Sequence, residues 1–304
     1  MSDPIVVAIA ADTNFSKQLA VVIASLSRVT GDRPHAVFVL HDGYTVELQA
    51  KVEQVAGTDV DLVWTDVSPS RAVTDALLPG HLPSATLYRL RLEELLPETI
   101  ERVIYLDADT IVRRSLAPLW ELDLDDRLAG GVRDAWINWS AQALPWRALG
   151  VSPQLPYFNC GVLLIPLGRW REHDVSAQAL RLAGEYRFQD GDQGAINVTL
   201  DGAWWQLDPR WNVQSTHLDG DHVGVRAIEP PELLDEAARD PAIVHFHFGA
   251  WGRPWLPGCN HPFAHEWLDL LDTTAWAGWR PAPRSRFSKA AGRVRRAAGT
   301  LRHG

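Results

Sequence analysis

Short apolar runs alternate with amphipathic segments over the first part of the chain, and this alternation limits the possible folds more than any other feature. Residues 5–10, 36–41 and 60–64 are the apolar runs, each as long as a buried strand. Residues 16–29 and 45–55 lie between them and have apolar side chains at the spacing of an amphipathic helix. The alternation predicts βαβ units and a mostly parallel sheet, so we expect an α/β fold.

The same pattern continues until about residue 272. A helix is predicted over residues 84–96, where Pro97 would end it. Further predicted elements are strands over 103–106, 128–132, 161–165 and 242–248, and a helix over 193–200. Apolar periodicity then stops. We therefore expect one folded domain, residues 1–272, followed by a basic, Arg-rich tail, residues 273–304, that is either disordered or a helix on a membrane surface.

Composition and charge narrow the function classes. The chain is 46% hydrophobic and 22% charged, as in a soluble globular protein. Residues 280–304 contain seven arginines and one lysine and no acidic residue, so residues 1–279 carry a formal charge of −17 (21 basic against 38 acidic residues). An acidic body argues against nucleic acid as a partner, whereas the basic tail suits an anionic membrane surface.

The sequence also bears on location. Two cysteines are too few for a disulfide framework, which favours a reducing compartment. No signal-peptide core precedes the first predicted strand, and no apolar stretch reaches the length that spans a bilayer. We expect a cytoplasmic protein, with peripheral attachment to the inner face of the plasma membrane as the role of the tail.

Two carboxylates stand at the end of one predicted strand. Asp107 and Asp109 flank Ala108 directly after the apolar run 103–106, and alternate residues of an extended chain point to one side. Two anions this close repel each other unless a positive group lies between them. A divalent metal would satisfy both, and such metals commonly hold phosphate groups as well. The alternative is a solvated acidic turn.

Two further segments offer groups for a nucleotide. Asp12 and Asn14 follow the first predicted strand, where they could bind a base or a ribose; alternatively, Thr13 or Asn14 caps the next helix. Arg89 lies in a predicted helix that otherwise has the pattern of a packed segment. Its guanidinium suits bidentate contact with phosphate or carboxylate, the alternative being a surface ion pair, for which Arg91 is the better candidate.

Two polar clusters could surround a sugar. Asn159 precedes a buried strand and needs a hydrogen-bond partner, which a sugar hydroxyl or a backbone turn would supply. The neighbouring Cys160 is expected to pack in the core rather than to act as a nucleophile. Residues 189–194, QDGDQG, place carboxylates and amides before a helix. They could cap that helix, or they could face the electron-poor carbon of a glycosyl transition state.

A late segment could complete a metal site. His245 and His247 alternate with phenylalanine, so both imidazoles share one face of a predicted strand, and one of them is expected to be a core histidine. An imidazole added to two carboxylates shifts the metal preference from Mg²⁺ towards Mn²⁺. Arg253 follows in a glycine-rich turn that could close over a diphosphate.

Taken in order, these motifs resemble those of the family 8 retaining glycosyltransferases, which include lipopolysaccharide galactosyl- and glucosyltransferases and glycogenin. The resemblance covers about residues 5–270. It implies a GT-A fold, which is a Rossmann-like fold that binds nucleotide-diphospho-sugars. It also implies a UDP-sugar donor, Mn²⁺ with Mg²⁺ as the alternative, and retention at the anomeric carbon. The motifs that carry it are YLDADT at 105–110, YFNCGVLL at 157–164, Asp192-Gln193 with Asn197, and the segment from His247 to Trp255.

The resemblance implies a role for each matched residue. It assigns the metal ligands as Asp107, Asp109 and His247, with His245 as the alternative. It assigns donor binding to Ala10, Asp12, Asn14, Arg89, Asp107, Ala108, Asp109, Asn159 and Arg253. It assigns the transferred sugar and the catalytic step to Gln193, Asp192 and Asp134, and the acceptor side to Trp211 and Asn212.

Three departures from the family pattern stand out. Gly194 replaces a second acidic residue that usually follows the Asp-Gln pair, and Arg253 replaces a lysine. The spacing around the histidines is also disturbed. Counting back from Arg253 selects His247, whereas counting forward from Pro241 selects His245. We predict His247 as the third metal ligand.

The resulting hypothesis is a metal-dependent retaining glycosyltransferase that moves glucose or galactose from a UDP-sugar to a glycan or lipid-linked acceptor. Two alternatives remain open at this stage. A phosphoaspartyl-type hydrolase also begins its motif with Asp-x-Asp after a strand, although it favours Thr or Val where this chain has Ile111. A non-catalytic carbohydrate-binding protein could use the 14 tryptophans for stacking on sugars, although most tryptophans are buried.

Overall fold

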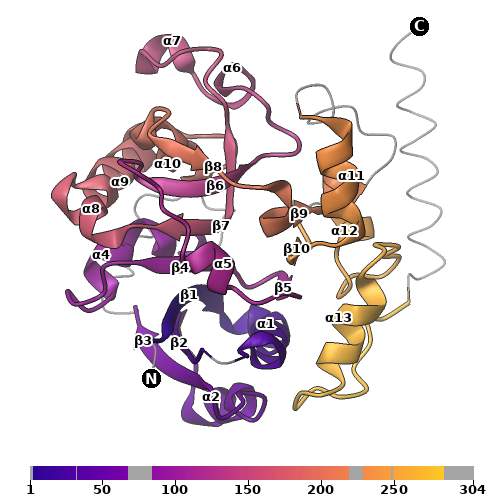
Figure 1. The fold of residues 1–304 in the computed structure, drawn as a ribbon. Helices are drawn as coiled ribbons and strands as arrows, with labels where there is room; N and C mark the ends of the chain where they lie inside the picture. The colour runs from indigo at the N-terminus through magenta and orange to yellow at the C-terminus, as the bar shows by residue number, and fades with distance from the viewer. Residues whose placement is uncertain (1–2, 32, 68–83, 219–228, 248, 284–304) are drawn as a thin grey trace, which may run out of the picture.

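A seven-stranded sheet forms the centre of the protein (Figure 1). The computed structural model describes residues 3–31, 33–67, 84–218, 229–247 and 249–283. The strands follow the order β3-β2-β1-β4-β7-β6-β8, and only β7 runs antiparallel to its neighbours. They are β1 (Ile5–Asp12), β2 (His35–Asp42), β3 (Val60–Asp66), β4 (Val103–Asp107), β6 (Ala129–Arg133), β7 (Phe158–Ile165) and β8 (Trp204–Gln206). The α/β class and the mostly parallel sheet are thus confirmed.

A second, three-stranded sheet lies beside the carboxyl end of β4. It consists of β5 (Thr110–Val112), β10 (Ile243–His245) and β9 (Val213–Gln214), in the order β5-β10-β9. β10 pairs antiparallel with β5, so His245 stands opposite Thr110. This pairing brings a late segment of the chain next to the two carboxylates that precede β5.

Helices cover both faces of the large sheet (Figure 1). Asp12 caps the first 3₁₀ turn with its carboxylate, and the Thr45 side chain accepts from the N–H of Leu48 at the start of α2. The α-helices are α1 (Ser16–Val29), α2 (Val46–Glu53), α4 (Leu92–Leu95), α5 (Ala117–Trp120), α6 (Ser140–Ala143), α7 (Trp146–Leu149), α8 (Leu167–Glu172), α9 (Val175–Glu185), α10 (Asp192–Leu200), α11 (Pro231–Arg239), α12 (Gly249–Gly252) and α13 (Ala264–Leu271). The 3₁₀ segments include η1 (Thr13–Phe15), η3 (Ser84–Arg91), η4 (Pro209–Asn212) and η5 (Ser215–Leu218).

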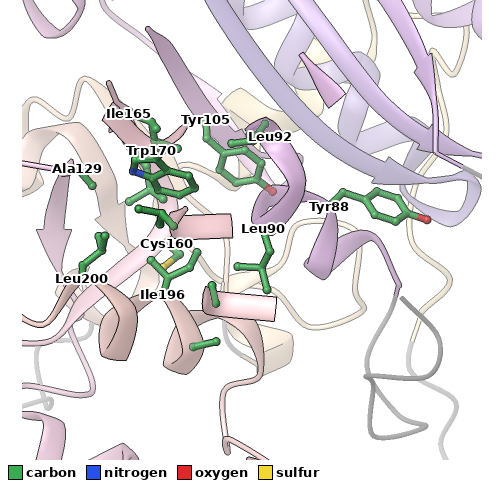
Figure 2. Packing of buried hydrophobic residues seen from close by; sticks show 14 of the residues in the cluster. Tyr88, Leu90, Leu92, Tyr105, Ala129, Cys160, Ile165, Trp170, Ile196 and Leu200 are labelled. Atoms are coloured by element: carbon green, nitrogen blue, oxygen red, sulfur yellow. The ribbon is translucent and has the colours of Figure 1, made fainter. Parts of the chain in front are cut away.

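Two hydrophobic clusters sandwich the sheet, which explains why its strands are continuous apolar runs. On one face, Ile9 of β1 packs with Leu19 and Ile23 of α1. On the other face, the cluster joins β4, β7 and the helices beyond them, and Figure 2 shows Tyr105, Cys160 and other members of this cluster side by side. Cys160 is fully buried, and burial raises the pKa of its thiol well above its ordinary value, as a packing role requires.

Some predicted elements differ in length or winding. The helix predicted over residues 84–96 is a 3₁₀ segment, η3, followed by the single turn α4, although it does end before Pro97. Residues 87–92 are buried without interruption, so packing on all sides overrides the 3.6-residue period. The strand predicted over 242–248 is shorter, because β10 comprises only Ile243–His245.

The chain beyond α13 still contacts the folded body. Trp276 packs against buried hydrophobic residues, and Arg280 forms an ion pair with Asp272 at 2.6 Å. Most of the predicted basic tail, residues 284–304, lies outside the described residues. Within the described part of the chain, no helix combines the length and apolar character needed to cross a bilayer.

Candidate active site

The carboxyl ends of β1 and β4 meet at one cavity of about 230 Å³. The two strands are hydrogen-bonded neighbours, with Ala10 opposite Asp107, so their ends open on the same edge of the sheet. This is where open α/β sheets bind ligands. Predicted donor residues that line the cavity are Ala10, Asp12, Arg89, Asp107, Ala108, Asp109 and Arg253. Sequence reasoning missed three other lining residues, Ala11, Phe15 and Tyr105.

Asp107, Asp109 and His245 form a compact group of metal-ligand type. One ligand atom from each side chain lies within 4.8 Å of the other two. Nε2 of His245 is 3.1 Å from Asp109 Oδ1 and 3.7 Å from Asp107 Oδ2. Burial alone would lower the pKa of His245, but the carboxylates of Asp109 and Asp107 raise it above its ordinary value. The group therefore concentrates negative charge around one shared point.

The geometry favours the alternative histidine. His247, selected by counting back from Arg253, belongs to no three-residue ligand group among the described residues, and its Nε2 lies 3.3 Å from Gln214 Oε1. The physical reason is the pairing of β10 with β5, which aligns residue 245 with Thr110 and so with the two carboxylates. Geometry thus favours His245, the alternative reached by counting forward from Pro241.

The donor set fits a divalent cation. Two carboxylates and one imidazole are ligands that suit Mn²⁺. Asp107 Oδ1 accepts from the Tyr105 hydroxyl at 3.0 Å, whereas Asp107 Oδ2 faces His245. A Cβ at Gly161 would lie 2.6 Å from His245 Nδ1 and 2.9 Å from Asp107 Oδ2. Only glycine at position 161 leaves room for these two side chains to approach each other.

Arg89 connects the carboxylates of β4 to the start of α10. Its Nη1 lies 3.3 Å from Asp107 Oδ1 and donates to the backbone oxygen of Cys160 at 2.6 Å, while its Nε forms a short ion pair with Asp192. Burial alone would lower the pKa of Arg89, but Asp107 and Asp192 raise it well above its ordinary value. Arg89 is therefore a buried permanent cation and not the surface ion pair considered as the alternative.

Gln193 is held in one orientation by three hydrogen bonds. Its Oε1 accepts from the backbone N–H of Cys160 at 3.0 Å. Its Nε2 donates to Asp134 Oδ2 at 3.2 Å and to Asp190 Oδ2 at 3.3 Å. Asn159 also donates to Asp134 Oδ2, at 3.0 Å. The structure thus brings Gln193, Asp134 and Asn159, predicted around the sugar, into one network.

Asp190, in the acidic segment 189–194, also belongs to this network, although the sequence motifs gave it no individual role. It receives a short hydrogen bond from the Tyr157 hydroxyl, and burial raises the pKa of its carboxyl to about 6. Its Oδ1 has no hydrogen-bond partner in the part of the chain that the structure describes, and it would lie 3.0 Å from a Cβ at Gly194. A Cβ at Gly194 would also lie 2.7 Å from the Phe188 side chain, so Phe188 and Asp190 together leave room only for glycine at position 194, where the family pattern would put an acidic residue. The sequence signal for Asp190 was its place two residues before Asp192.

Two predicted residues take other positions. Asn14 is exposed and does not line the cavity; its backbone N–H donates to Asp12 Oδ1 at 2.8 Å. The cap of this turn is Asp12, not Thr13 or Asn14. Arg253 follows α12 and lines the cavity, and its buried Nε has no hydrogen-bond partner among the described residues. That unused donor beside the acidic group is available to an anionic ligand.

The strand order and the acidic group at the switch between strands define a GT-A glycosyltransferase. The sequence profile described as "Glycosyl transferase family 8" matches residues 6–258. The chain therefore belongs to glycosyl transferase family 8. This assignment supports neither the phosphoaspartyl hydrolase nor the non-catalytic carbohydrate-binding protein.

Individual relatives agree with the family. General stress protein A of Bacillus subtilis is 26% identical over 280 residues, which cover 88% of this chain and 92% of that protein. Lipopolysaccharide 1,3-galactosyltransferase of Salmonella typhimurium is 23% identical over 291 residues, covering 91% and 80%. The solved structure of galactosyltransferase LgtC with donor and acceptor sugar analogues has a TM-score of 0.75 and 26% identity, covering 89% of this chain and 96% of that one. Other curated relatives are longer, and matches span only 30–53% of their length.

Proposed function

We propose that this chain is a metal-dependent retaining hexosyltransferase that moves glucose or galactose from a UDP-sugar to a glycan or lipid-linked acceptor. The observation that carries the proposal is the grouping of His245 with Asp107 and Asp109, two carboxylates that line a cavity together with Arg253. This arrangement offers one place for a divalent cation and a separate cation for phosphate. LgtC was solved with donor and acceptor sugar analogues, which supports the same classes of ligand here.

Different residues in and beside the cavity would bind different parts of the donor. Asp107, Asp109 and His245 would hold Mn²⁺, or alternatively Mg²⁺, which as a Lewis acid would neutralise charge on a departing diphosphate. Arg253 lines the same cavity and would bind that diphosphate. Asp12 and Ala10 at the end of β1 line the cavity and would contact the nucleoside, whereas the exposed Asn14 does not line it.

The residues expected around the transferred sugar, Asp192 and Gln193, favour a mechanism in which the diphosphate leaves and the acceptor attacks on the same face of the anomeric carbon. Asp192 is buried, at 4% exposure, and paired with Arg89, so its carboxylate is not free to act as a nucleophile. Gln193 is uncharged, and its amide is locked by Cys160, Asp134 and Asp190. Its fixed dipole can stabilise positive charge that develops on the sugar without forming a stable covalent bond. Retention by front-face chemistry follows.

The proposal is tested by incubating the full chain with a panel of UDP-sugars and measuring UDP release, with Mn²⁺, with Mg²⁺ and with a chelator. We expect UDP release from UDP-glucose or UDP-galactose that requires the metal. Phosphate release from simple phosphomonoesters without any nucleotide-sugar turnover would contradict the proposal. Binding of sugars without UDP release under any condition would contradict it as well.

Two features bear on the proposed acceptor and on attachment to a membrane. Trp136 follows Asp134 by two residues and is 49% exposed, and we propose that it contributes to the acceptor site. The basic residues of segment 280–304 would attract an anionic membrane surface, at about 1 kcal/mol per basic residue near the lipid. Deleting residues 284–304 should abolish sedimentation with anionic vesicles and leave UDP release intact. A truncated chain that still sediments would contradict membrane attachment through this segment.

A further inference from the structure

A series of side-chain hydrogen bonds connects the metal-ligand group to Gln193. Asn212, the last residue of η4, is fully buried and lies between two residues of the site. Its Oδ1 is 3.1 Å from His245 Nδ1, and its Nδ2 donates to Asn159 Oδ1 at 2.9 Å. Asn159 in turn donates to Asp134, which also accepts from Gln193. Asn212 is thus the link between the imidazole and the sugar side.

A backbone N–H fixes the direction of the hydrogen bonds that run from Asn159 through Asn212 to His245. The N–H of Gly161 can only donate, and it donates to Asn159 Oδ1 at 3.0 Å. The Asn212 atom that faces Asn159 Oδ1 must therefore be the NH₂ group, which leaves Asn212 Oδ1 to face His245. An oxygen can only accept, so His245 must carry a proton on Nδ1. The lone pair of the neutral ring is then on Nε2, the nitrogen that faces Asp107 and Asp109.

We infer that Asn212 is a positioning residue for the metal-ligand group, since it holds His245 in the tautomer and ring orientation that present Nε2 to the shared point between Asp107 and Asp109. The inference rests on the proposed metal-dependent function. Asn212 would touch neither metal nor sugar, and it acts only through His245 and Asn159. Ligating histidines generally donate their other ring N–H to such an acceptor, and loss of it typically weakens metal affinity about 10–100-fold.

Two substitutions separate the two hydrogen bonds of Asn212. Asn212→Ala removes the acceptor for His245 and the donor to Asn159, so Mn²⁺ affinity should fall about 10–100-fold. Asn212→Asp keeps an acceptor towards His245 but turns a second acceptor towards Asn159 Oδ1. It should therefore keep Mn²⁺ affinity within a few-fold of the unchanged chain, or above it, while turnover falls.

The measurement is Mn²⁺ binding to the full-length protein in the presence of UDP, followed by the electron paramagnetic resonance signal of free Mn²⁺. Asn197→Ala is the matched control. Asn197 is equally buried, and its amide pairs with the backbone N–H and C=O of Phe158 at 3.0 Å each. This variant should lower the unfolding temperature without changing Mn²⁺ affinity. A purely structural role for Asn212 would give the same result for Asn212→Ala and would overturn the inference.

The unchanged protein provides a second readout that needs no variant of Asn212. Nitrogen-15 shifts of the His245 ring at alkaline pH, assigned by their absence in His245→Ala, should show Nδ1 protonated and Nε2 bare. The opposite tautomer would overturn the inference even if the metal site is real. Failure of the unchanged protein to bind Mn²⁺ would instead contradict the proposed function, so the two failures can be told apart.

Discussion

At the scale of single residues, motif spacing and geometry disagree about which histidine is the proposed third metal ligand. The sequence offers two histidines two residues apart, and alternation places both on one face of a strand. β10 ends at His245, so the strand alternation does not extend to His247. Pairing with β5 favours His245 as the proposed ligand, because it places His245 beside Asp109. Burial and the neighbouring His245 lower the pKa of His247 well below its ordinary value, which keeps its ring neutral.

Substituting each histidine in turn tests this assignment. His245→Ala should lower Mn²⁺ affinity by more than about 10-fold, because it removes a proposed ligand and not merely a group that orients one. His247→Ala should change that affinity much less, since its ring nitrogen contacts Gln214. Mn²⁺ titration in the presence of UDP measures both. A larger loss of Mn²⁺ affinity in His247→Ala than in His245→Ala would instead support His247, the ligand expected from the spacing to Arg253.

Among the elements, an irregularity in β7 builds much of the site. The register between β6 and β7 jumps, so that Gly131 faces Leu163 and Val132 faces Asn159. Such bulges re-aim side chains and release backbone groups from the ladder. Here the N–H of Cys160 bonds to Gln193 and its C=O accepts from Arg89. One strand therefore fixes both the sugar-side amide and the central arginine.

Gly161 lies in the same irregularity and can be tested directly. Gly161→Ala should weaken Mn²⁺ binding at least about 10-fold, because the added methyl group overlaps His245 and crowds Asp107. Gly57→Ala is the control, since its added methyl would make ordinary contact with Ser27 at 3.6 Å. Equal Mn²⁺ affinity in both variants, measured by the same titration, would show that the close approach at position 161 is not needed.

The sequence predicted those parts of the fold and site that depend on local pattern. Apolar periodicity located β1, β2, β3 and α10, and the acidic pair after β4 identified one wall of the cavity. It could not predict contacts that depend on strand register. The pairing of Arg89 with both Asp107 and Asp192, and the hydrogen bond from Tyr157 to Asp190, join segments 18 to 103 residues apart in the chain. Nothing in the local pattern specifies those distances.

At the scale of the whole molecule, buried histidines outside the site link stability to pH. His35 at the start of β2 is 1% exposed, and neither ring nitrogen has a hydrogen-bond partner within the described segments. Burial, with a contribution from Arg33, lowers its pKa from 6.5 to about 4. The unfolded chain therefore binds more protons than the folded one between these pH values. The contribution of His35 to the free energy of unfolding should rise with pH from about 4 to about 6.5, whereas Asp190 and Asp192, whose carboxyl pKa burial raises to about 6, oppose it below about pH 6.

His35→Leu tests the sign of this dependence. Relative to the unchanged chain, removing the titrating ring should make the unfolding free energy change less favourably as pH rises across that range, by at most about 3 kcal/mol. Urea unfolding at a series of pH values measures it. His261 contributes a remaining slope in the same direction, because burial also lowers its pKa to about 4. The same substitution at the exposed His265 serves as the control, and a steeper rise with pH in His35→Leu would contradict the account.

The large sheet, the small sheet and the bulge in β7 together place an acidic metal-ligand group beside a locked amide, which is the arrangement proposed for glycosyl transfer. The most direct measurement is Mn²⁺-dependent UDP release from the preferred UDP-sugar by Asp107→Asn, with Asp126→Asn, 94% exposed on its side chain, as the control. We predict that Asp107→Asn loses about 10²–10³-fold in turnover, the size expected when stabilisation of developing negative charge is removed, while Asp126→Asn is unchanged. Full turnover by Asp107→Asn with the metal bound would contradict the account.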